Sequence, residues 1–492
     1  MFSFTSFRLM HWSAAVYCIS GPAHMSTSSS RLFIAIATGQ NIANLPPILE
    51  IADQGDAVLW IQSREARTGK YAEGSERVLK HYGLERLKPL NVPTVSEPAA
   101  LVRELRAWFA RRPKWAAADT YVVLSGGTKL SAIGLEHGVQ NERRCFLYNA
   151  DQPVELWRFE GRLDRPPQRQ PYKRCQLDLP DILVANRSAT YEKQVEGTRI
   201  WPACQIRTPE YGRDVDHTIA WHEDAYFCAD AGNQTTEDDT EWNIARVCEV
   251  LGSEYLANKA RTLLSELADR SSTEIYQRLY AIRAQWMEEA KAKRKRALYE
   301  RRYGAIGPAF ERFVAYRVQR FLNNTRCSIV KSAWANVAVS REDEKGQARG
   351  ELDVAVVLRN GIVLHLECKA GQPAVKDLYA RITALQRATS RLARMYVCLP
   401  AIPAAQPLDE TASVPGWFAL QERTREILEN ASLQIIDVDV GLERRSSYVR
   451  NGQRVEVVPF ERSLERILAP FLPEHERQGR DRSQGSEDTA QM

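Results

Sequence analysis

The sequence has few of the features that mark a secreted, membrane-spanning or cysteine-stabilised protein. Its 492 residues include nine cysteines, an odd number, and no C-x-x-C pair, so neither a disulfide framework nor a cysteine zinc site is indicated. It also has no uncharged apolar run of roughly eighteen residues, so no membrane span is expected. Both absences favour a protein of the reducing cytoplasm.

Strong charge of one sign and the common phosphate-binding fingerprints are missing too. The net charge is only +5, so any surface for nucleic acid has to be local. Neither the Walker A spacing G-x-x-x-x-G-K nor the dinucleotide fingerprint G-x-G-x-x-G occurs. The length leaves room for two or three domains and more than one sizeable core.

What the sequence does contain, in its first part, is an alternation of short apolar strands with amphipathic helices. This alternation predicts βαβ units and a parallel sheet. In such sheets, ligands bind outside the carboxyl ends of the strands. The expected strands are 32–37, 57–61 and 121–124, and the expected helices are 72–82, 97–110 and 130–137.

Three of these strand ends are polar and flexible, which makes them candidate ligand-binding segments. The third runs into a helix, and its two glycines, hydroxyl and lysine suit a phosphate at the helix N-terminus. A plain strand-to-helix turn is the alternative for a Gly-Gly-Thr sequence. The candidate residues are Gly39, Gln40, Asn41 and Asn44 after the first strand, Ser63 and Arg64 after the second, and Ser125, Gly126, Gly127, Thr128 and Lys129 after the third.

The most informative stretch is Gly350–Lys369, which reads as two apolar strands around an Arg-Asn-Gly turn. Period two places Glu367 and Lys369 on one face. A two-residue turn would turn Asp353 away from them, whereas a three-residue turn with Gly361 in the left-handed region pairs Asp353 with Glu367. Two carboxylates ~4 Å apart repel by ~4 kcal/mol at a surface-like dielectric, so the pair implies a cation. On that ground we expect the three-residue turn.

Two carboxylates and a lysine on one face predict a divalent-metal site. Oxygen ligands suit Mg²⁺ or Mn²⁺, and Lys369 is expected to orient water or to stabilise developing negative charge. Glu311, on a preceding amphipathic helix, is the third expected metal ligand and fourth catalytic residue. His365 shares the strand face of Glu367, but a packed core histidine is its favoured role.

This spacing resembles the PD-(D/E)xK nuclease superfamily, with Asp353, a hairpin, then Glu367-Cys368-Lys369, and Glu311 on the helix before. The resemblance implies a restriction-endonuclease-like α/β core and metal-dependent phosphodiester hydrolysis. A surface hairpin with a solvated Glu-x-Lys pair is the structural alternative. A helix at 377–392 and strands at 395–399 and 433–440 are expected to continue the core.

The segments 39–44 (GQNIAN) and 125–129 (SGGTK) resemble loops of the CRISPR-associated Rossmann-fold (CARF) domain. Proteins that join this domain to a PD-(D/E)xK nuclease are ancillary effectors of type III CRISPR systems. The resemblance implies that a homodimer binds cyclic oligoadenylate, usually cyclic tetra-adenylate, and then cleaves DNA, RNA or both. Lys129 would take phosphate, and Gln40, Asn44 and Ser63 would contact sugar or adenine.

The expected organisation is α/β throughout, with a Rossmann-like CARF domain, a helical middle region and a C-terminal nuclease domain. Two alternatives stay open: an unregulated PD-(D/E)xK defence or repair nuclease, and a non-catalytic nucleotide sensor. The expected boundaries are 1–30 for a disordered leader or misassigned start, 31–160 for the CARF domain, 161–302 for an excursion and helical linker, 303–470 for the nuclease, and 471–492 for a disordered tail.

Overall fold

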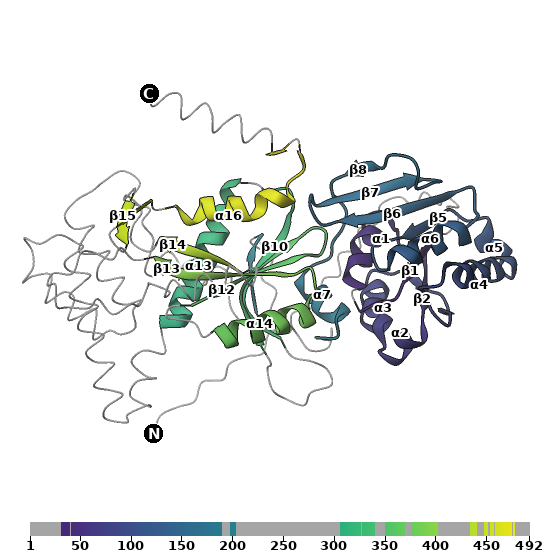
Figure 1. Cartoon of the computed structure of the whole chain (residues 1–492), viewed down its shortest axis with the longest axis horizontal. Helices are drawn as coiled ribbons and strands as arrows, with labels where there is room; N and C mark the ends of the chain where they lie inside the picture. Colours follow the sequence, from purple (N-terminus) through teal and green to yellow (C-terminus); the bar gives the residue numbers. More distant parts are fainter. Residues whose placement is uncertain are drawn as a thin grey trace, which may run out of the picture.

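The protein, seen in a computed structural model, contains two large β-sheets, each flanked by helices, which lie side by side (Figure 1). None of the described helices is long and apolar enough to cross a membrane. The predicted leader at 1–30, most of the helical linker, Gln40 and most of the predicted tail lie outside the described residues. The structure describes residues 31–39, 41–188, 197–202, 306–325, 327–339, 350–369, 375–401, 433–439, 447–450, 453–456, 458–474 and 476–477.

The first sheet is Rossmann-like and has the order β3-β2-β1-β5-β6-β7-β8, with β4 also paired to β2. Its centre consists of parallel strands β1 (Leu32–Ile36), β2 (Ala57–Gln62), β5 (Thr120–Val123) and β6 (Arg144–Ala150). This pairing confirms the predicted βαβ architecture. The remaining strands are β3 (Glu85–Arg86), β4 (Leu90–Asn91), β7 (Glu155–Glu160) and β8 (Gln168–Gln170).

Helices cover both faces of this sheet because β1 is apolar on both sides. Phe33 packs in one buried cluster with α1, α3 and α7, whereas Ile34 packs in a second cluster with α4 and α6. Burial on both faces explains the near-continuous apolar runs that the sequence shows. The helices are η1 (Asn41–Asn44), α1 (Leu45–Ile51), α2 (Arg64–Thr68), α3 (Tyr71–His81), α4 (Pro98–Ala110), α5 (Pro113–Ala116), α6 (Lys129–Gly138) and α7 (Leu179–Ala185).

The second sheet has six strands in the order β14-β13-β12-β11-β10-β9. Strands β9 to β12 pair antiparallel, and β12 to β14 pair parallel. One of them, β9, comes from the segment expected to be a linker. The strands are β9 (Thr198–Trp201), β10 (Val330–Val339), β11 (Gly350–Leu358), β12 (Val363–Cys368), β13 (Arg394–Ala401) and β14 (Gln434–Asp439), and a separate hairpin contains β15 (Ser447–Arg450) and β16 (Gln453–Glu456).

Two layers of helices enclose the second sheet (Figure 1). Helices α13 (Ile306–Thr325) and α16 (Phe460–Leu468), the latter followed by η3 (Ala469–Phe471), pack on the face formed by Val356, Leu364 and Leu366. Helix α14 (Val375–Ala388) lies on the other face, beside His365. The odd-numbered residues of β11 and β12 therefore face α14, and this is the face that carries Asp353 and Glu367.

The β11–β12 turn has the three-residue form expected from the sequence. Leu358 N–H donates to Ile362 O at 2.8 Å, and Val354 pairs with Leu366. Gly361 has φ +83°, a backbone conformation that favours glycine. The strand pairing ends at Val354 and Leu366, and this register places Asp353 opposite Glu367 one position further, so the predicted register is confirmed.

The same turn docks directly into the first domain. Asn149 Nδ2 donates to Asn360 O at 3.0 Å, and Asn360 Nδ2 donates to Ala150 O at 3.0 Å. Beside them, the Cα of Gly361 faces Ile42 and Leu177 so closely that an added Cβ would lie 3.1 and 3.3 Å from their side chains. One buried apolar cluster consequently runs through both sheets.

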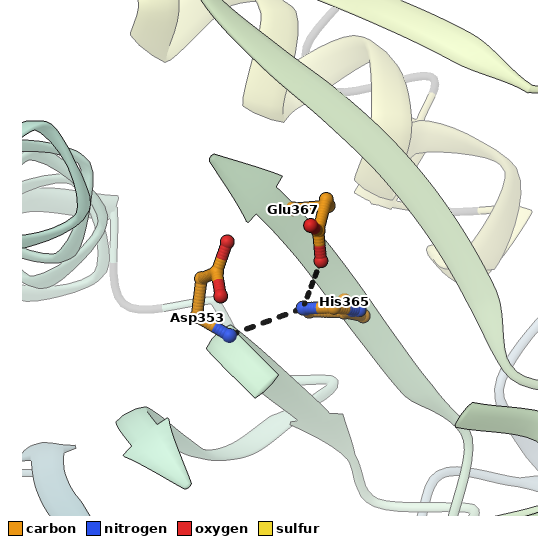
Figure 2. A group of neighbouring side chains, drawn as sticks. All are labelled: Asp353, His365 and Glu367. Carbon is orange, nitrogen blue, oxygen red and sulfur yellow. Dashed lines mark hydrogen bonds and ion pairs between the residues drawn. The ribbon is translucent and has the colours of Figure 1, made fainter. Parts of the chain in front are cut away.

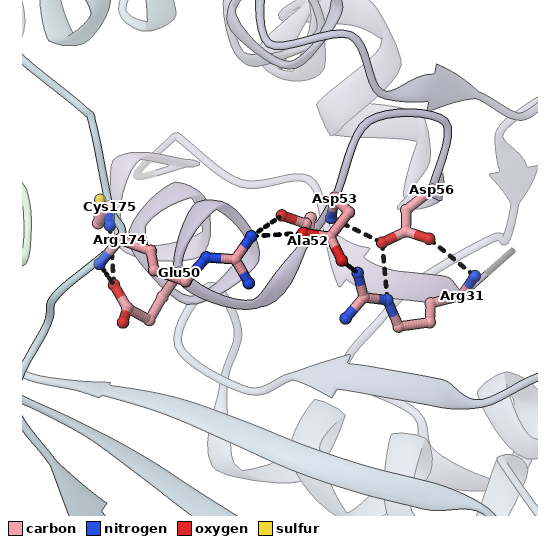
Figure 3. Close-up of polar contacts among 7 residues, drawn as sticks. All are labelled: Arg31, Glu50, Ala52, Asp53, Asp56, Arg174 and Cys175. Atoms are coloured by element: carbon pink, nitrogen blue, oxygen red, sulfur yellow. Dashed lines mark hydrogen bonds and ion pairs between the residues drawn. The ribbon is translucent and has the colours of Figure 1, made fainter. Parts of the chain in front are cut away.

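A buried carboxylate anchors the chain where it leaves the first sheet for the second (Figure 3). Glu50, 5% exposed at the end of α1, accepts hydrogen bonds from the backbone N–H groups of Lys173, Arg174 and Cys175 at 2.8–3.0 Å. The segment then reaches Asp178, which caps α7 and accepts from Trp334 Nε1 of β10 at 3.0 Å. Three donors on one carboxylate compensate its burial.

We expect Asn360→Ala to destabilise the folded protein by about 1–3 kcal/mol, because it leaves the buried Ala150 carbonyl without its donor. Urea unfolding measures the change as a lower midpoint. Asn91→Ala, at an exposed position of β4, is the matched control and should leave the midpoint unchanged. Equal midpoints for the two variants would contradict a docked turn.

Candidate active site

Asp353 of β11 and the pair His365 and Glu367 of β12 point toward one another (Figure 2). One ligand atom from each lies within 4.8 Å of the others. Their exposed fractions are 2%, 1% and 0%, so the two acids are withdrawn from water. Buried carboxylates this close need cationic or hydrogen-bonding partners.

The sheet hydrogen bonding is interrupted at Asp353, which frees this residue for other contacts. On the β10 side, Asn336 stands opposite Asp353 with φ +52°, and the two do not pair. On the β12 side, the backbone N–H of Cys368 donates to Asp353 Oδ2 at 2.7 Å. The backbone N–H of Asp353 donates to His365 Nε2 at 3.1 Å. Irregular backbone of this kind is common at functional sites.

Two cationic side chains compensate the acids. Arg381 of α14 places Nη1 2.8 and 3.0 Å from the two carboxylate oxygens of Glu367 and 3.7 Å from Asp353 Oδ1. Lys369 forms an ion pair with Glu367 Oε1. Both cations are partly exposed, at 40% and 24%, so the site opens toward solvent on their side.

The electrostatics of the group favour a proton on Asp353 and none on His365. Burial, with the charges of Glu367 and Glu311, raises the pKa of Asp353 to about 8. Burial, with Arg381 and Lys369, lowers the pKa of His365 to about 3, so the imidazole is neutral. Its Nε2 accepts a hydrogen bond from Asp353 N–H, which occupies the lone pair that a metal would need.

The residues fit a divalent cation bound by oxygen. The nitrogens of Arg381 and Lys369 already lie against Glu367 Oε1, so this buried oxygen is one that attracts cations. Among the described residues, the polar contact of Asp353 Oδ1 is the one with Arg381 at 3.7 Å. Carboxylate oxygens of this kind suit Mg²⁺ or Mn²⁺.

Glu311 lies on α13, outside the group of three converging ligand atoms. It is nonetheless close enough for its charge to act on Asp353, and burial and the Glu351 charge raise the pKa of Glu311 itself. Arg381 was not predicted from the sequence. Arg381 lies fourteen residues beyond Glu367, on a helix whose orientation depends on packing, and no local pattern singles out this arginine.

In the first domain, two predicted ligand residues support the loops instead of facing solvent. Asn44 is 0% exposed, and its Nδ2 donates to Ile36 O at 3.0 Å. A Cβ on Gly126 would collide with the Asn44 amide, so this glycine is needed for an internal contact. Asn41, 3% exposed, accepts from Thr38 N–H at 2.7 Å and donates to Tyr71 O. The Asn44 side chain is therefore buried within the loops in this structure, and its contact with a ligand stays a prediction.

The other predicted ligand residues lie nearer the surface. Ser63 and Thr128 are N-caps, accepting from Ala66 N–H at 3.1 Å and Ser131 N–H at 3.2 Å. Ser125 Oγ accepts from Asn149 N–H at 2.7 Å. Gly39, Arg64, Gly127, Thr128 and Lys129 are exposed at the ends of β1, β2 and β5.

The sequence matches no family model and no curated relative. Among solved structures, the fold is similar to protein VC1899 from Vibrio cholerae, with a TM-score of 0.50 and 14% identity over 83% of this chain and 94% of that one. A second is Can2 from Sulfobacillus thermosulfidooxidans in complex with cyclic tetra-adenylate, at TM-score 0.46 and 11% identity over 83% and 95% of the two chains. A third is a type III CRISPR defence DNA nuclease activated by cyclic oligoadenylate. Its TM-score is 0.39 and its sequence identity 13%, over 81% of this chain and 52% of that one.

The VC1899 likeness shows a shared fold and, at 14% identity, nothing more. The class that fold and site define is an α/β protein with a Rossmann-like first sheet and a second sheet that carries a buried acidic cluster. Within that class, the cluster is distinguished by Asp353 and Glu367 on paired strands, with Lys369 and Arg381 beside them.

The raised pKa of Asp353 predicts how stability depends on pH when metal is chelated. The folded protein keeps this proton to about pH 8, whereas the unfolded chain loses it near 3.8, so stability falls as pH rises through this window. Unfolded histidine, with a pKa of ~6.5, also titrates in part of this window, but His365 is common to both proteins, so its contribution cancels in the comparison below. We expect the free energy of unfolding to fall by about 2 kcal/mol more across pH 6.5–8 than in Asp353→Asn. Parallel curves for the two proteins in chemical denaturation would refute this protonation state.

Proposed function

We propose that this protein is a metal-dependent nuclease of type III CRISPR defence that cyclic oligoadenylate, first of all cyclic tetra-adenylate, activates from the CARF domain. The substrate class is DNA, RNA or both. The observation that carries the proposal is the convergence of Asp353 and Glu367, with Lys369 on the same strand end. This geometry is the one that the PD-(D/E)xK resemblance requires.

The residues divide the chemistry between them. Asp353 and Glu367 would supply the carboxylate oxygens for Mg²⁺ or Mn²⁺, and Glu311 of α13, whose charge acts on Asp353, would be a further ligand. A bound divalent ion would lower the pKa of water and polarise the phosphodiester. Lys369, whose ammonium group is partly exposed beside Glu367, orients the attacking water or neutralises charge on the phosphate.

Arg381 holds the two acids together before metal binds. Its guanidinium group neutralises Glu367 and touches Asp353, and its pKa is raised despite burial because of the carboxylates around it. A divalent ion between the acids would compete with this contact for the same oxygens. Arg381 is then available, at the open side of the site, for a substrate phosphate.

The ligand half of the proposal rests on the exposed ends of the parallel strands. Thr128 and Lys129 begin α6, where the helix dipole and free N–H groups favour an anion. Next to them, Leu130 and Ile133 are 50% and 45% exposed, an apolar strip on α6 that supports a homodimer next to the ligand loops. A twofold dimer would present the same loops to opposite nucleotides of a cyclic ligand.

A short hydrogen-bonded path joins the ligand loop to the catalytic hairpin. Ser125, directly before the two glycines, accepts from Asn149 N–H at 2.7 Å. Asn149 in turn donates to Asn360 O in the β11–β12 turn at 3.0 Å. The loop and the strands that carry Asp353 and Glu367 are therefore connected through two residues, which gives allosteric control a physical route.

The test is a cleavage assay on DNA and RNA with Mn²⁺ or Mg²⁺, run with and without cyclic tri-, tetra- and hexa-adenylate. We expect cleavage only with both metal and one of these rings. Asp353→Asn and Lys369→Ala should each lower the cleavage rate by about a hundredfold or more while ring binding is retained, since each removes a group that acts on the reacting phosphate.

Lys88→Ala, an exposed lysine of the first domain, is the control and should cleave as the unmodified protein does. Full cleavage by a folded Asp353→Asn variant would reject the active site. Cutting with metal alone, unchanged by any ring, would reject the regulation and favour an unregulated nuclease.

A further inference from the structure

A cavity of about 380 Å³ lies between the end of β1 and helix α14, where the two halves of the molecule meet. It shares only Gly39 and Asn41 with the ligand residues predicted from the sequence. Its described lining residues are Thr38, Gly39, Asn41, Gly69, Lys70, Tyr71, Ala185, Asn186, Arg187, Thr383, Gln386, Arg387 and Arg391.

The charge of this cavity is entirely positive among its described lining residues. Lys70 and Arg187 come from the first half, Arg387 and Arg391 from α14 and the turn that follows it. Lys70 has an exposed ion pair with Glu73 at 3.6 Å, outside the lining. Within the described chain, no carboxylate pairs with the three arginines. Cations gathered around one hollow attract an anion into it.

The backbone of the cavity wall is also unusual. Lys70 and Arg187 have φ of +53° and +61°, and they are two of the three non-glycine residues with positive φ among those described. Arg187 Nη1 donates to Gly69 O at 3.3 Å, but its Nε is buried without a hydrogen-bond partner. Strained backbone and a buried unpaired donor at one place indicate a binding site.

Helix α3 adds backbone donors to the same wall. It begins at Tyr71, and its N-cap residue, Lys70, provides no side-chain cap. The N–H groups of the first turn therefore receive no hydrogen bond acceptor from the side chain of the N-cap residue. The positive end of the helix dipole lies at the cavity.

We propose that this cavity binds a phosphate group of a nucleotide ligand, through Lys70, Arg187 and the start of α3 from the first half and through Arg387 and Arg391 from the second. Its volume lies at the lower end of the usual range for small-ligand sites, so it suits one nucleotide of a larger ring. The inference rests on the proposed function for the identity of that ring, and it adds residues of the nuclease half to the ligand site.

The position of the site gives the bound phosphate direct contact with the catalytic half. Thr383 and Arg387 line both this cavity and a neighbouring cavity of about 480 Å³ that also contains His365 and Arg381. Arg381, six residues before Arg387 on α14, holds Glu367. An anion bound to Arg387 would therefore contact α14, the same helix whose Arg381 forms the ion pair with Glu367.

The test is titration of cyclic tetra-adenylate into the full-length protein and into Arg387→Gln, Arg391→Gln and Lys376→Gln. Lys376 is exposed on the same helix and does not line the cavity, so its variant removes the same charge elsewhere. We expect about tenfold weaker binding for each arginine variant and a salt dependence reduced by about one charge, with Lys376→Gln unchanged.

Unchanged affinity in both arginine variants would overturn the proposal. So would a loss of DNA or RNA binding at unchanged cyclic tetra-adenylate affinity, because the cavity would then serve the substrate. If the unmodified protein binds no cyclic tetra-adenylate, the ring of the proposed function is wrong, and inorganic pyrophosphate becomes the probe. The phosphate site is supported if pyrophosphate raises the melting temperature of the unmodified protein and of Lys376→Gln but not that of Arg387→Gln. It is rejected if pyrophosphate stabilises none of these proteins, or stabilises both variants equally.

Discussion

The mutual repulsion of Asp353 and Glu367 is the constraint on which the rest of the second domain depends. These acids face each other on neighbouring strands, both almost completely buried. Such a pair persists only with compensation, and the structure provides it as a proton held on Asp353, the guanidinium group of Arg381 and the ammonium group of Lys369. Arg381 and Lys369 are partly exposed, at 40% and 24%, so the side of the pair on which they lie is open to solvent.

The fold places this pair at the end of a rigid support. The turn between β11 and β12 is held by reciprocal bonds between Asn149, Ala150 and Asn360, and the strands are covered by apolar helices on the face opposite the acids. The first domain is therefore not merely tethered to the half that carries the second sheet. It shares a core with the hairpin, and packed and hydrogen-bonded contacts run from its loops to the strands that carry the acids.

Much of this could be predicted from the sequence, and the reasons are local. The Asn360-Gly361 turn chemistry and the apolar period of two defined the hairpin, and the electrostatics of Asp353 and Glu367 chose its register. The alternation of strands with helices defined the parallel sheet. These features depend on residues close together along the chain.

What could not be predicted depends on contacts between distant segments. Arg381 reaches Glu367 only because α14 packs on one face of the sheet, and strand β9 joins that sheet from a segment that reads as a linker. Asn44 resembles a ligand residue by its place after β1, yet it lies beneath Gly126 because the two loops pack together. Burial and helix orientation follow from tertiary structure, which short motifs do not encode.

Anomalous X-ray scattering from crystals of the protein soaked in Mn²⁺ above pH 8 tests the central claim most directly. The account predicts a manganese peak about 2.1 Å from carboxylate oxygens of both Asp353 and Glu367, with Arg381 moved off Glu367. A map without manganese at these oxygens, in which Arg381 still contacts Glu367, would contradict it.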